Sequence, residues 1–183
     1  MEKVARRHIA GTDLVILLGD ITVQGTDAIV NAANSGLRGG GGVDGAIHRA
    51  AGPIIDRECR AHVAQHGKLP PGRAMWTHGG NLAARYIIHT VGPIYRSDDE
   101  SEPVLQRAYQ ESLRLADGLA LESISFPAIS AGVYGYPLDK AARVAIEAIT
   151  DYLQQGESSL KLVQMVCFSN ASYAAFSDAL DAA

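Results

Sequence analysis

Hydrophobic residues along this chain fall into short continuous runs and longer periodic stretches, and the two kinds alternate. The continuous runs predict buried strands, because apolar residues stand at consecutive positions rather than at every second one. They cover Asp13–Leu18, Ala28–Ala33, Ala74–Thr77, Tyr86–Val91, Ser123–Ile129 and Leu160–Phe168. The periodic stretches repeat apolar residues every three or four positions, which predicts amphipathic helices. These cover Val43–Ala51, Pro53–His66, Glu102–Leu119, Leu138–Leu153 and Ala171–Leu180.

This alternation predicts a three-layer α/β/α domain with a mixed, largely parallel central sheet of about six strands. A chain of 183 residues can bury a full core as one domain, so we expect a single domain over residues 1–183. The polar, acidic stretch Ser97–Glu102 is expected to be a surface loop. Because ligands bind outside the carboxyl ends of parallel strands, functional residues are expected in the loops at those ends.

Composition narrows the possible partners. The net charge is −4 and no run of Lys or Arg occurs, which argues against nucleic-acid binding. The longest clean apolar run, Leu14–Leu18, is too short for a membrane span, and no signal peptide is recognisable. Cys59 and Cys167 are too few for a disulfide framework and are expected to be buried thiols. We therefore expect a cytoplasmic protein.

Candidate functional residues first appear at the end of the predicted strand Ala28–Ala33 and directly after it. Asn31 and Asn34 stand at the end of this strand, and the glycine run Gly39–Gly42 follows. Asp44 then opens a helix. Glycines let backbone amides approach an anion closely, and a helix N-terminus favours negative charge. A strand, a glycine loop and a helix start in this order predict a phosphate-binding loop.

A second glycine-containing loop, Ser130–Pro137, follows the predicted strand Ser123–Ile129. Neither loop has the dinucleotide-binding Gly-x-Gly-x-x-Gly context or a Gly-Lys-Ser/Thr sequence. Two such loops suggest a ligand with two or more phosphates held between them. A nucleotide base could then lie near Asp20 with Phe168 stacking on it, although Asp20 is also placed to cap the following helical turn.

Several longer motifs, taken together, resemble the macrodomain family over essentially the whole chain. They are Gly19–Thr22, Asn31–Asn34, Val43–His48, Tyr86–Pro93 and Gly132–Pro137. The resemblance is to the MacroD-type branch, which contains ADP-ribosyl hydrolases and O-acetyl-ADP-ribose deacetylases. It implies ADP-ribose as the ligand.

The resemblance also implies roles by position. Asp20 would accept a hydrogen bond from the adenine amino group, the Ile21 amide would contact the ring, and Phe168 would stack on it. The diphosphate would be bound by the backbone amides of Ser130, Ala131, Gly132, Val133 and Tyr134. Asn34 would hold the distal ribose together with the amides of Gly41, Gly42 and Val43. Asp44 would orient or activate water, and Asn34 is placed with it as a catalytic residue.

The chain departs from the family pattern at Ala131, where relatives often have Thr, at Ala83, where Pro is common, and at Arg73, where an acidic residue is common. Ala131 removes a hydroxyl beside the phosphates. Because backbone amides carry that part of the site, we expect binding to survive.

Simpler roles compete with these. A carboxylate such as Asp44 in the first helical turn can merely complement the helix dipole, and the helix N-terminus makes it a weak base. We expect it to position water while a substrate phosphate helps to take the proton. Asn31 is placed among the ligand-binding residues, but bracing of loop backbone is the role we favour for it. His48, one turn after Asp44, is expected to pack against or support it, and His89 to be a satisfied core histidine.

His62 and His66 stand four residues apart on a predicted helix. No third ligand has a recognisable spacing, so we expect a solvated helix face and no metal site.

The sequence thus predicts a hydrolase acting on ADP-ribose esters, releasing acetate from O-acetyl-ADP-ribose or mono-ADP-ribose from protein Asp or Glu side chains. Its partners would be ADP-ribose, its esters and ADP-ribosylated proteins, and no cofactor is expected. A non-catalytic ADP-ribose binding module and a phosphatase acting on ADP-ribose phosphate remain as alternatives.

Overall fold

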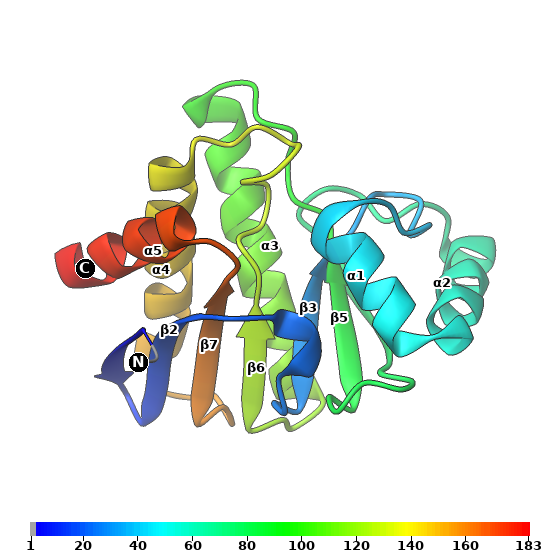
Figure 1. Cartoon of the computed structure of the whole chain (residues 1–183), viewed down its shortest axis with the longest axis horizontal. Helices are drawn as coiled ribbons and strands as arrows, with labels where there is room; N and C mark the ends of the chain where they lie inside the picture. The colour runs from blue at the N-terminus through cyan, green and yellow to red at the C-terminus, as the bar shows by residue number, and fades with distance from the viewer. Residues whose placement is uncertain (1–2) are drawn as a thin grey trace.

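Residues 3–183, which the computed structural model describes, form one mixed sheet of seven strands in the order β1-β2-β7-β6-β3-β5-β4 (Figure 1). The strands are β1 (Val4–Ile9), β2 (Thr12–Leu18), β3 (Ala28–Ala32), β4 (Ala74–His78), β5 (Tyr86–Thr90), β6 (Ser123–Phe126) and β7 (Leu162–Cys167). The helices are α1 (Gly42–Ala51), α2 (Pro53–His66), α3 (Asp98–Gly118), α4 (Leu138–Gln154) and α5 (Asn170–Ala182), with a short 3₁₀ helix η1 (Ile21–Val23).

The predicted α/β/α fold with a largely parallel sheet is confirmed. The five inner strands run parallel, and the edge strands β1 and β4 pair antiparallel with their neighbours. The hydrophobic pattern missed β1, in which exposed and half-buried residues alternate as far as Ile9. An edge strand open to solvent needs no continuous apolar run. Ala10 and Gly11, both with positive φ, form the tight turn into β2.

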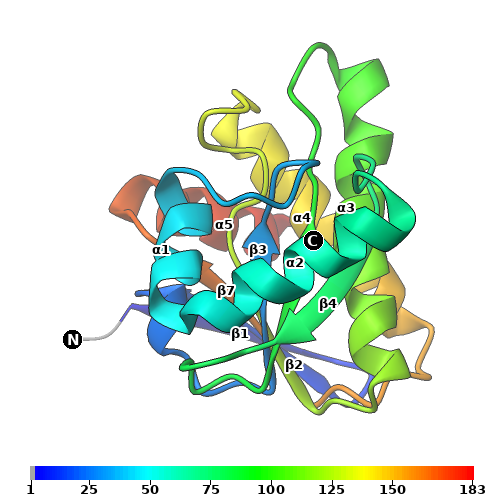
Figure 2. The ribbon, with the colours of Figure 1, turned by 90° about the vertical axis from the view of Figure 1, so that its right-hand side faces the viewer.

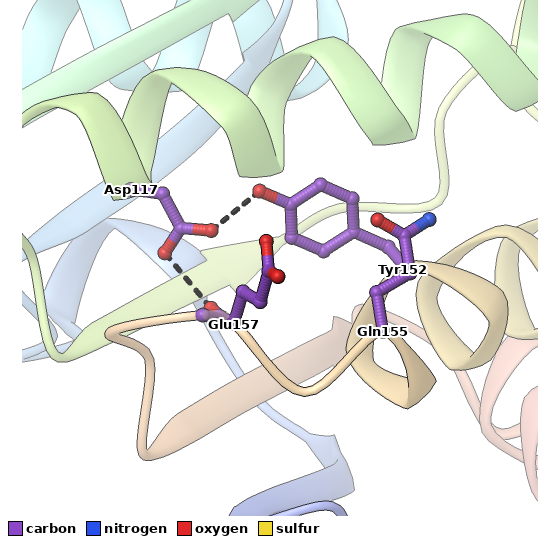
Figure 3. A pocket seen from close by; sticks show the side chains of 5 residues that line it. Asp117, Tyr152, Gln155 and Glu157 are labelled. Carbon is purple, nitrogen blue, oxygen red and sulfur yellow. Dashed lines mark hydrogen bonds between the residues drawn. The ribbon is translucent and has the colours of Figure 1, made fainter.

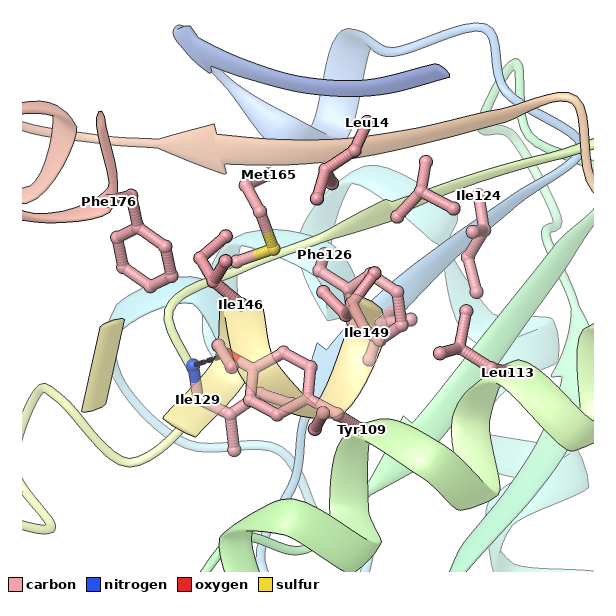
Figure 4. Close-up of a cluster of buried hydrophobic side chains, with 14 of the residues drawn as sticks. Leu14, Tyr109, Leu113, Ile124, Phe126, Ile129, Ile146, Ile149, Met165 and Phe176 are labelled. Atoms are coloured by element: carbon pink, nitrogen blue, oxygen red, sulfur yellow. Dashed lines mark hydrogen bonds between the residues drawn. The ribbon is translucent and has the colours of Figure 1, made fainter. Parts of the chain in front are cut away.

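Successive residues of the central strands face opposite layers of helices, as strand geometry requires. Val30 and Ile88 pack into the larger core, which α3, α4 and α5 cover. Figure 4 shows part of this core, around Tyr109. Ile29 and Ile87 pack into the smaller core, which α1 and α2 cover. Figures 1 and 2 show the sheet between these two layers. The continuous apolar runs in the sequence arise because both faces of these strands are buried.

The predicted surface loop Ser97–Glu102 is wrong, because α3 begins at Asp98. Ser97 is the N-cap, and its hydroxyl accepts a hydrogen bond from the Glu100 amide at 3.2 Å. The acidic residues that suggested a solvated loop occupy the first helical turn, where they complement the helix dipole. Pro103, inside the helix, does not prevent this capped start.

Other boundaries differ from the prediction by small amounts. The strand predicted over Ser123–Ile129 ends at Phe126, since Pro127 has no amide to donate to a ladder. Cys59 and Cys167 are free and buried, as predicted, and burial raises the pKa of their thiols to about 12 and about 11. Among the helices of residues 3–183, none combines the length and hydropathy that a membrane span requires.

Candidate active site

Both glycine loops follow parallel strands and therefore lie at the same edge of the sheet, the upper edge in Figure 1. The first leads from β3 to α1 and the second from β6 to α4, and β3 pairs directly with β6. Ser35 of the first loop and Tyr134 of the second line one cavity. The loops thus border a common site.

Asp44 lies in the first turn of α1 and is only 7% exposed. Its Oδ1 atom accepts a hydrogen bond from Asn31 Nδ2 at 2.8 Å and lies 3.3 Å from His48 Nε2. A Cβ atom placed on Gly40 would lie 3.5 Å from the other oxygen, Oδ2. Asp44 is therefore fixed through Oδ1, while Oδ2 faces the glycine loop.

His48 bridges two carboxylates. Its Nε2 faces Asp44, and its Nδ1 lies 2.8 Å from Asp56 Oδ1 at the start of α2. The hydrogen bond with Asp44, opposed by burial and supported by Asp56, raises the pKa of His48 above its ordinary value. Only the imidazolium form can donate to both carboxylates at once. The expected support of Asp44 by His48 is confirmed.

His89 is a satisfied core histidine, as predicted, and burial lowers its pKa to about 3. Its Nδ1 lies 3.1 Å from Asn31 Nδ2, and its Nε2 lies 3.0 Å from Thr77 Oγ1. Because the Nδ2 atom of Asn31 can only donate, Nδ1 of His89 is the acceptor and Nε2 of His89 carries the proton. A continuous hydrogen-bonded chain therefore runs from Thr77 through His89 and Asn31 to Asp44.

The two asparagines have different partners in the structure. Asn31 does not brace the loop: it is fully buried, and both hydrogen bonds of its amide group go to the side chains of Asp44 and His89. The brace is Asn34, which donates to the Gly39 carbonyl at 2.9 Å and accepts from the Arg38 amide at 3.2 Å. Asn31 lies within β3 on the face covered by α1, whereas Asn34 lies beyond the strand. The side chain of Asn31 has no exposed surface, so the structure shows it holding Asp44 and His89, and its direct contact with a ligand stays a prediction.

The glycine loop packs closely on the helix that it precedes. A Cβ atom on Gly45 would lie 2.2 Å from the Gly40 carbonyl oxygen, so only glycine permits this contact. Gly42 has φ +58° and is exposed, as is Gly41, the N-cap of α1. The first amides of the helix therefore open toward solvent beside Asp44, where an anion or a ribose hydroxyl can accept their hydrogen bonds.

The second glycine loop is anchored to the protein at its first residue and exposed at its middle. Ser130, with φ +65°, donates through its hydroxyl to the Pro93 carbonyl at 2.7 Å, so this hydroxyl is bound to the protein. Gly132 and Val133 are exposed. Within residues 3–183, the amides of Gly132, Val133 and Tyr134 donate no hydrogen bond to the protein. Three neighbouring free donors suit the oxygens of a diphosphate.

Asp20 and Phe168 come together across the pair formed by β2 and β7. Leu18 pairs with Cys167, so the next residues of both strands emerge side by side. Asp20 does cap η1, since its Oδ1 accepts from the Thr22 amide at 2.9 Å. Phe168 is 91% exposed, an unusual environment for a large apolar ring and one suited to stacking on a planar ligand.

A comparison with protein families matches the Macro domain over residues 30–145. The chain belongs to the macro domain family. Its relatives include an O-acetyl-ADP-ribose deacetylase of Cronobacter sakazakii, 47% identical over a region that covers 86% of this chain and 88% of the relative.

Solved macro domain structures agree over the whole fold. The Oceanobacillus iheyensis macrodomain with ADP superposes with a TM-score of 0.95 at 42% identity, covering 100% of this chain and 97% of the other. The Trypanosoma brucei macrodomain in complex with ADP-ribose gives a TM-score of 0.81 at 41% identity, covering 89% of this chain and 68% of the other.

Sequence reasoning missed three residues that organise this macro domain's site. Tyr109 is buried in α3, and its hydroxyl accepts from the Ile129 amide at 3.1 Å, which anchors the start of the second loop (Figure 4). Asp56 and Thr77 hold the two histidines described above. The partners of all three residues lie on other elements, 8 to 20 residues away, so no spacing rule within one helix or strand finds them. Only the central position of Tyr109 on the apolar stripe of α3 hinted that it is buried.

Other polar clusters of the macro domain are less suited to ligands. His62 and His66 have ring centroids 4.8 Å apart, but no group of three or more potential metal ligands occurs in residues 3–183. A cavity of about 170 Å³ lies at the opposite end of the sheet, beside Asp117 (Figure 3). Asp117 accepts hydrogen bonds from Tyr152 and from the Ser159 amide, so it ties α3 to α4 and to the chain leading into β7.

Proposed function

We propose that this macro domain binds ADP-ribose and hydrolyses its esters, with O-acetyl-ADP-ribose as a substrate. The observation that carries the proposal is Asp44, buried and fixed through Oδ1, with Oδ2 directed at a glycine loop in which Gly41 and Gly42 are exposed. A residue that only complemented the helix dipole would need neither Asn31 nor His48. The deacetylase name of the Cronobacter sakazakii relative supports the same activity.

The free amides and the exposed aromatic ring suggest how ADP-ribose lies. Adenine stacks on Phe168 and its amino group donates to Asp20, while the Ile21 amide contacts the ring. The amides of Gly132–Tyr134 donate to the diphosphate, which therefore needs no basic side chain. The distal ribose then reaches Asn34 and the first amides of α1, beside Asp44. The ADP and ADP-ribose in the solved macrodomain structures support ADP-ribose as the ligand.

Asp44 would hold the attacking water through Oδ2. In deacetylation, the water oxygen adds to the acetyl carbonyl carbon, the bond from that carbon to the ribose oxygen breaks, and the ribose oxygen takes a proton. The products are acetate and ADP-ribose. Asn31 and His48 hold the carboxylate in place, so that the water is oriented before the reaction begins. A phosphate of the substrate can assist by accepting the water proton.

The same geometry supports a second substrate. An ester between the distal ribose and a protein Asp or Glu side chain presents the same bond to the water, and we include its hydrolysis in the proposal. Both substrates release free ADP-ribose, so one assay detects both. Protein substrates would approach from the open side of the loops.

The deciding experiment compares wild-type protein with Asp44→Ala on O-acetyl-ADP-ribose and on a protein carrying mono-ADP-ribose esters. Released ADP-ribose is measured by chromatography and ADP-ribose affinity by calorimetry. We expect Asp44→Ala to lower the rate by about 100-fold or more, the size of effect expected when the group that positions the reacting water is lost, with affinity nearly unchanged. Melting curves check that the variant is folded.

Two results would support the alternatives instead. Tight ADP-ribose binding by the wild type with no release from either ester would leave a binding module. Release of inorganic phosphate from ADP-ribose phosphate, with both esters left intact, would indicate a phosphatase.

A further inference from the structure

A cavity of about 280 Å³ is lined by Ser35 of the first glycine loop and by Tyr134 of the second. One wall comes from both glycine loops, and the other comes from the segment that joins β5 to α3 and from the first turns of α3 itself. Ser35 and Tyr134 represent the loops, and Val91, Ile94 and Val104 represent the other wall. None of these residues has a role in the binding of ADP-ribose described above, apart from the Tyr134 amide.

Its position follows from chain neighbours. Ser35 is next to Asn34, the residue proposed to contact the distal ribose. Tyr134 ends the row of free amides proposed for the diphosphate. The two walls are joined, because the Tyr95 amide donates to the Tyr134 carbonyl at 2.9 Å. A group attached to the distal ribose can therefore enter the cavity without displacing the diphosphate.

The walls suit an aliphatic group. Valine, isoleucine and proline side chains form their apolar part, and Ile94 is 61% exposed. The charged residues that also line the cavity, Arg96 and Glu100, are exposed to solvent. The buried hydroxyl of Ser101 already accepts a hydrogen bond from the Arg96 amide at 3.0 Å. A peptide backbone placed here would lose hydrogen bonds to water without gaining enough partners. The volume is below the range of roughly 300–1,000 Å³ typical of complete small-molecule sites, so it fits one part of a ligand.

We propose that this cavity binds the acyl chain of O-acyl-ADP-ribose, so that the protein acts on esters with short aliphatic chains longer than acetyl. The inference rests on the proposed hydrolase function. The reaction is the same as for acetate: water adds to the acyl carbonyl carbon, the carbon–oxygen bond to the ribose breaks, and a short-chain carboxylic acid leaves. No further reactant is needed.

Each buried methylene changes an equilibrium or a rate constant ratio by up to about fourfold. A butyryl ester has two methylenes more than an acetyl ester. We therefore expect kcat/KM for O-butyryl-ADP-ribose to exceed that for O-acetyl-ADP-ribose by roughly tenfold. A site open to water beyond the ribose would show no such gain.

The test combines a chain-length series with a variant that fills the cavity. Val104→Trp places an indole in the cavity from a half-buried position on α3. It should reduce kcat/KM for the butyryl ester to the acetyl value and leave the acetyl value within about twofold, since it removes only the methylene gain. Val4→Trp, on the distant edge strand β1, adds the same side chain to another partly exposed valine and should change neither ester.

A binding measurement separates failure of the cavity from failure of the proposed hydrolysis. Amide analogues of the acetyl and butyryl esters are not cleaved, and the butyryl analogue should bind roughly tenfold more tightly. If this holds while no ester is hydrolysed, the hydrolase proposal fails and the cavity assignment stands. Hydrolysis of the acetyl ester without any gain in rate or affinity for butyryl overturns the cavity assignment alone.

Two further outcomes would also overturn the acyl assignment. One is an equal loss on all esters in folded Val104→Trp, which would mean that the substitution acts on the ribose site. The other is slower release from an ADP-ribosylated protein with unchanged acyl-chain preference, which would assign the cavity to a peptide.

Discussion

The hydrogen bond from Asn31 to Asp44 can be tested by changing one atom pair in a buried site. Asn31→Asp preserves the volume of the side chain but replaces the donating Nδ2 amino group with an oxygen. A second carboxylate oxygen would then stand about where Nδ2 lies now, 2.8 Å from Asp44 Oδ1. The variant therefore tests charge and hydrogen bonding with little change in packing.

Magnitudes decide how the variant responds. Two charges at this separation repel by about 6 kcal/mol at an effective dielectric constant near 20. Protonating a carboxyl at pH 7 costs only about 4 kcal/mol, given an ordinary aspartate pKa of about 3.9. The complete burial of residue 31 adds to the penalty on a second charge. The folded variant therefore keeps one proton on the pair, which the unfolded chain releases.

The expected result is a loss of stability that grows with pH. Because the folded variant binds one proton more than the unfolded chain, its free energy of unfolding falls by about 1.4 kcal/mol per pH unit relative to wild type. Between pH 5 and pH 7 this is about 2.7 kcal/mol, or roughly 5–10 °C in Tm for a domain of this size. His48 is present in both proteins, so its own titration largely cancels in the difference.

Urea denaturation at pH 5, 6 and 7, followed by the fluorescence of Trp76, the single tryptophan, provides the measurement. Asn31→Ala is the matched control: it loses the same donors without adding charge, so its cost of about 1–3 kcal/mol should not vary with pH. Equal pH dependence of the two variants would refute the geometry, because it would mean that residue 31 does not face the Asp44 carboxylate.

Three further predictions concern the parts around Asp44. Gly45→Ala should weaken ADP-ribose binding by about tenfold and destabilise the fold by about 1–3 kcal/mol, because its Cβ would lie 2.2 Å from the Gly40 carbonyl oxygen; unchanged calorimetric affinity would contradict this. Asp56→Asn should lower the pKa of His48 toward its ordinary value of 6.5, as followed by NMR. Because the folded pKa is the raised one, the stability lost in this variant should be seen below pH 6.5 and vanish as the pH rises through the folded pKa, and a loss confined to alkaline pH would be inconsistent. Phe168→Ala should weaken ADP-ribose binding by about 5- to 100-fold through lost stacking but leave Tm and the binding of ribose phosphate unchanged, since the ring is 91% exposed; an equal loss for both ligands would reject the stacking role.

A chain of hydrogen-bonded polar side chains crosses the buried face of the sheet and holds Asp44. It starts at Thr77 on β4, passes through His89 and Asn31, and ends at Asp44. Every member is buried, so each lost partner would leave an unsatisfied polar group. The position of Asp44 therefore depends on β4 and β5, two strands that contact no part of the proposed ligand.

The sequence alone determined the elements and the general place of the site. The period of apolar residues distinguishes helix from buried strand, because it records which faces are covered. Glycine runs at strand ends and the motifs shared with macrodomains located the phosphate loops. The prediction from the local pattern was wrong in two places. It missed β1, which is largely exposed, and it predicted a loop after Ser97, where acidic residues in fact begin a helix.

Only the tertiary structure decided which partner each polar side chain finds. Asn31 and Asn34 look equivalent in sequence, but β5 brings His89 beside one, and the folded loop surrounds the other. Asp20 and Phe168 become neighbours only because β2 pairs with β7. The physical reason is that apolar burial follows from local periodicity, whereas a hydrogen bond depends on which distant strands lie side by side. Sequence therefore placed the loops and the carboxylate, and the order of the strands determined how that carboxylate is held.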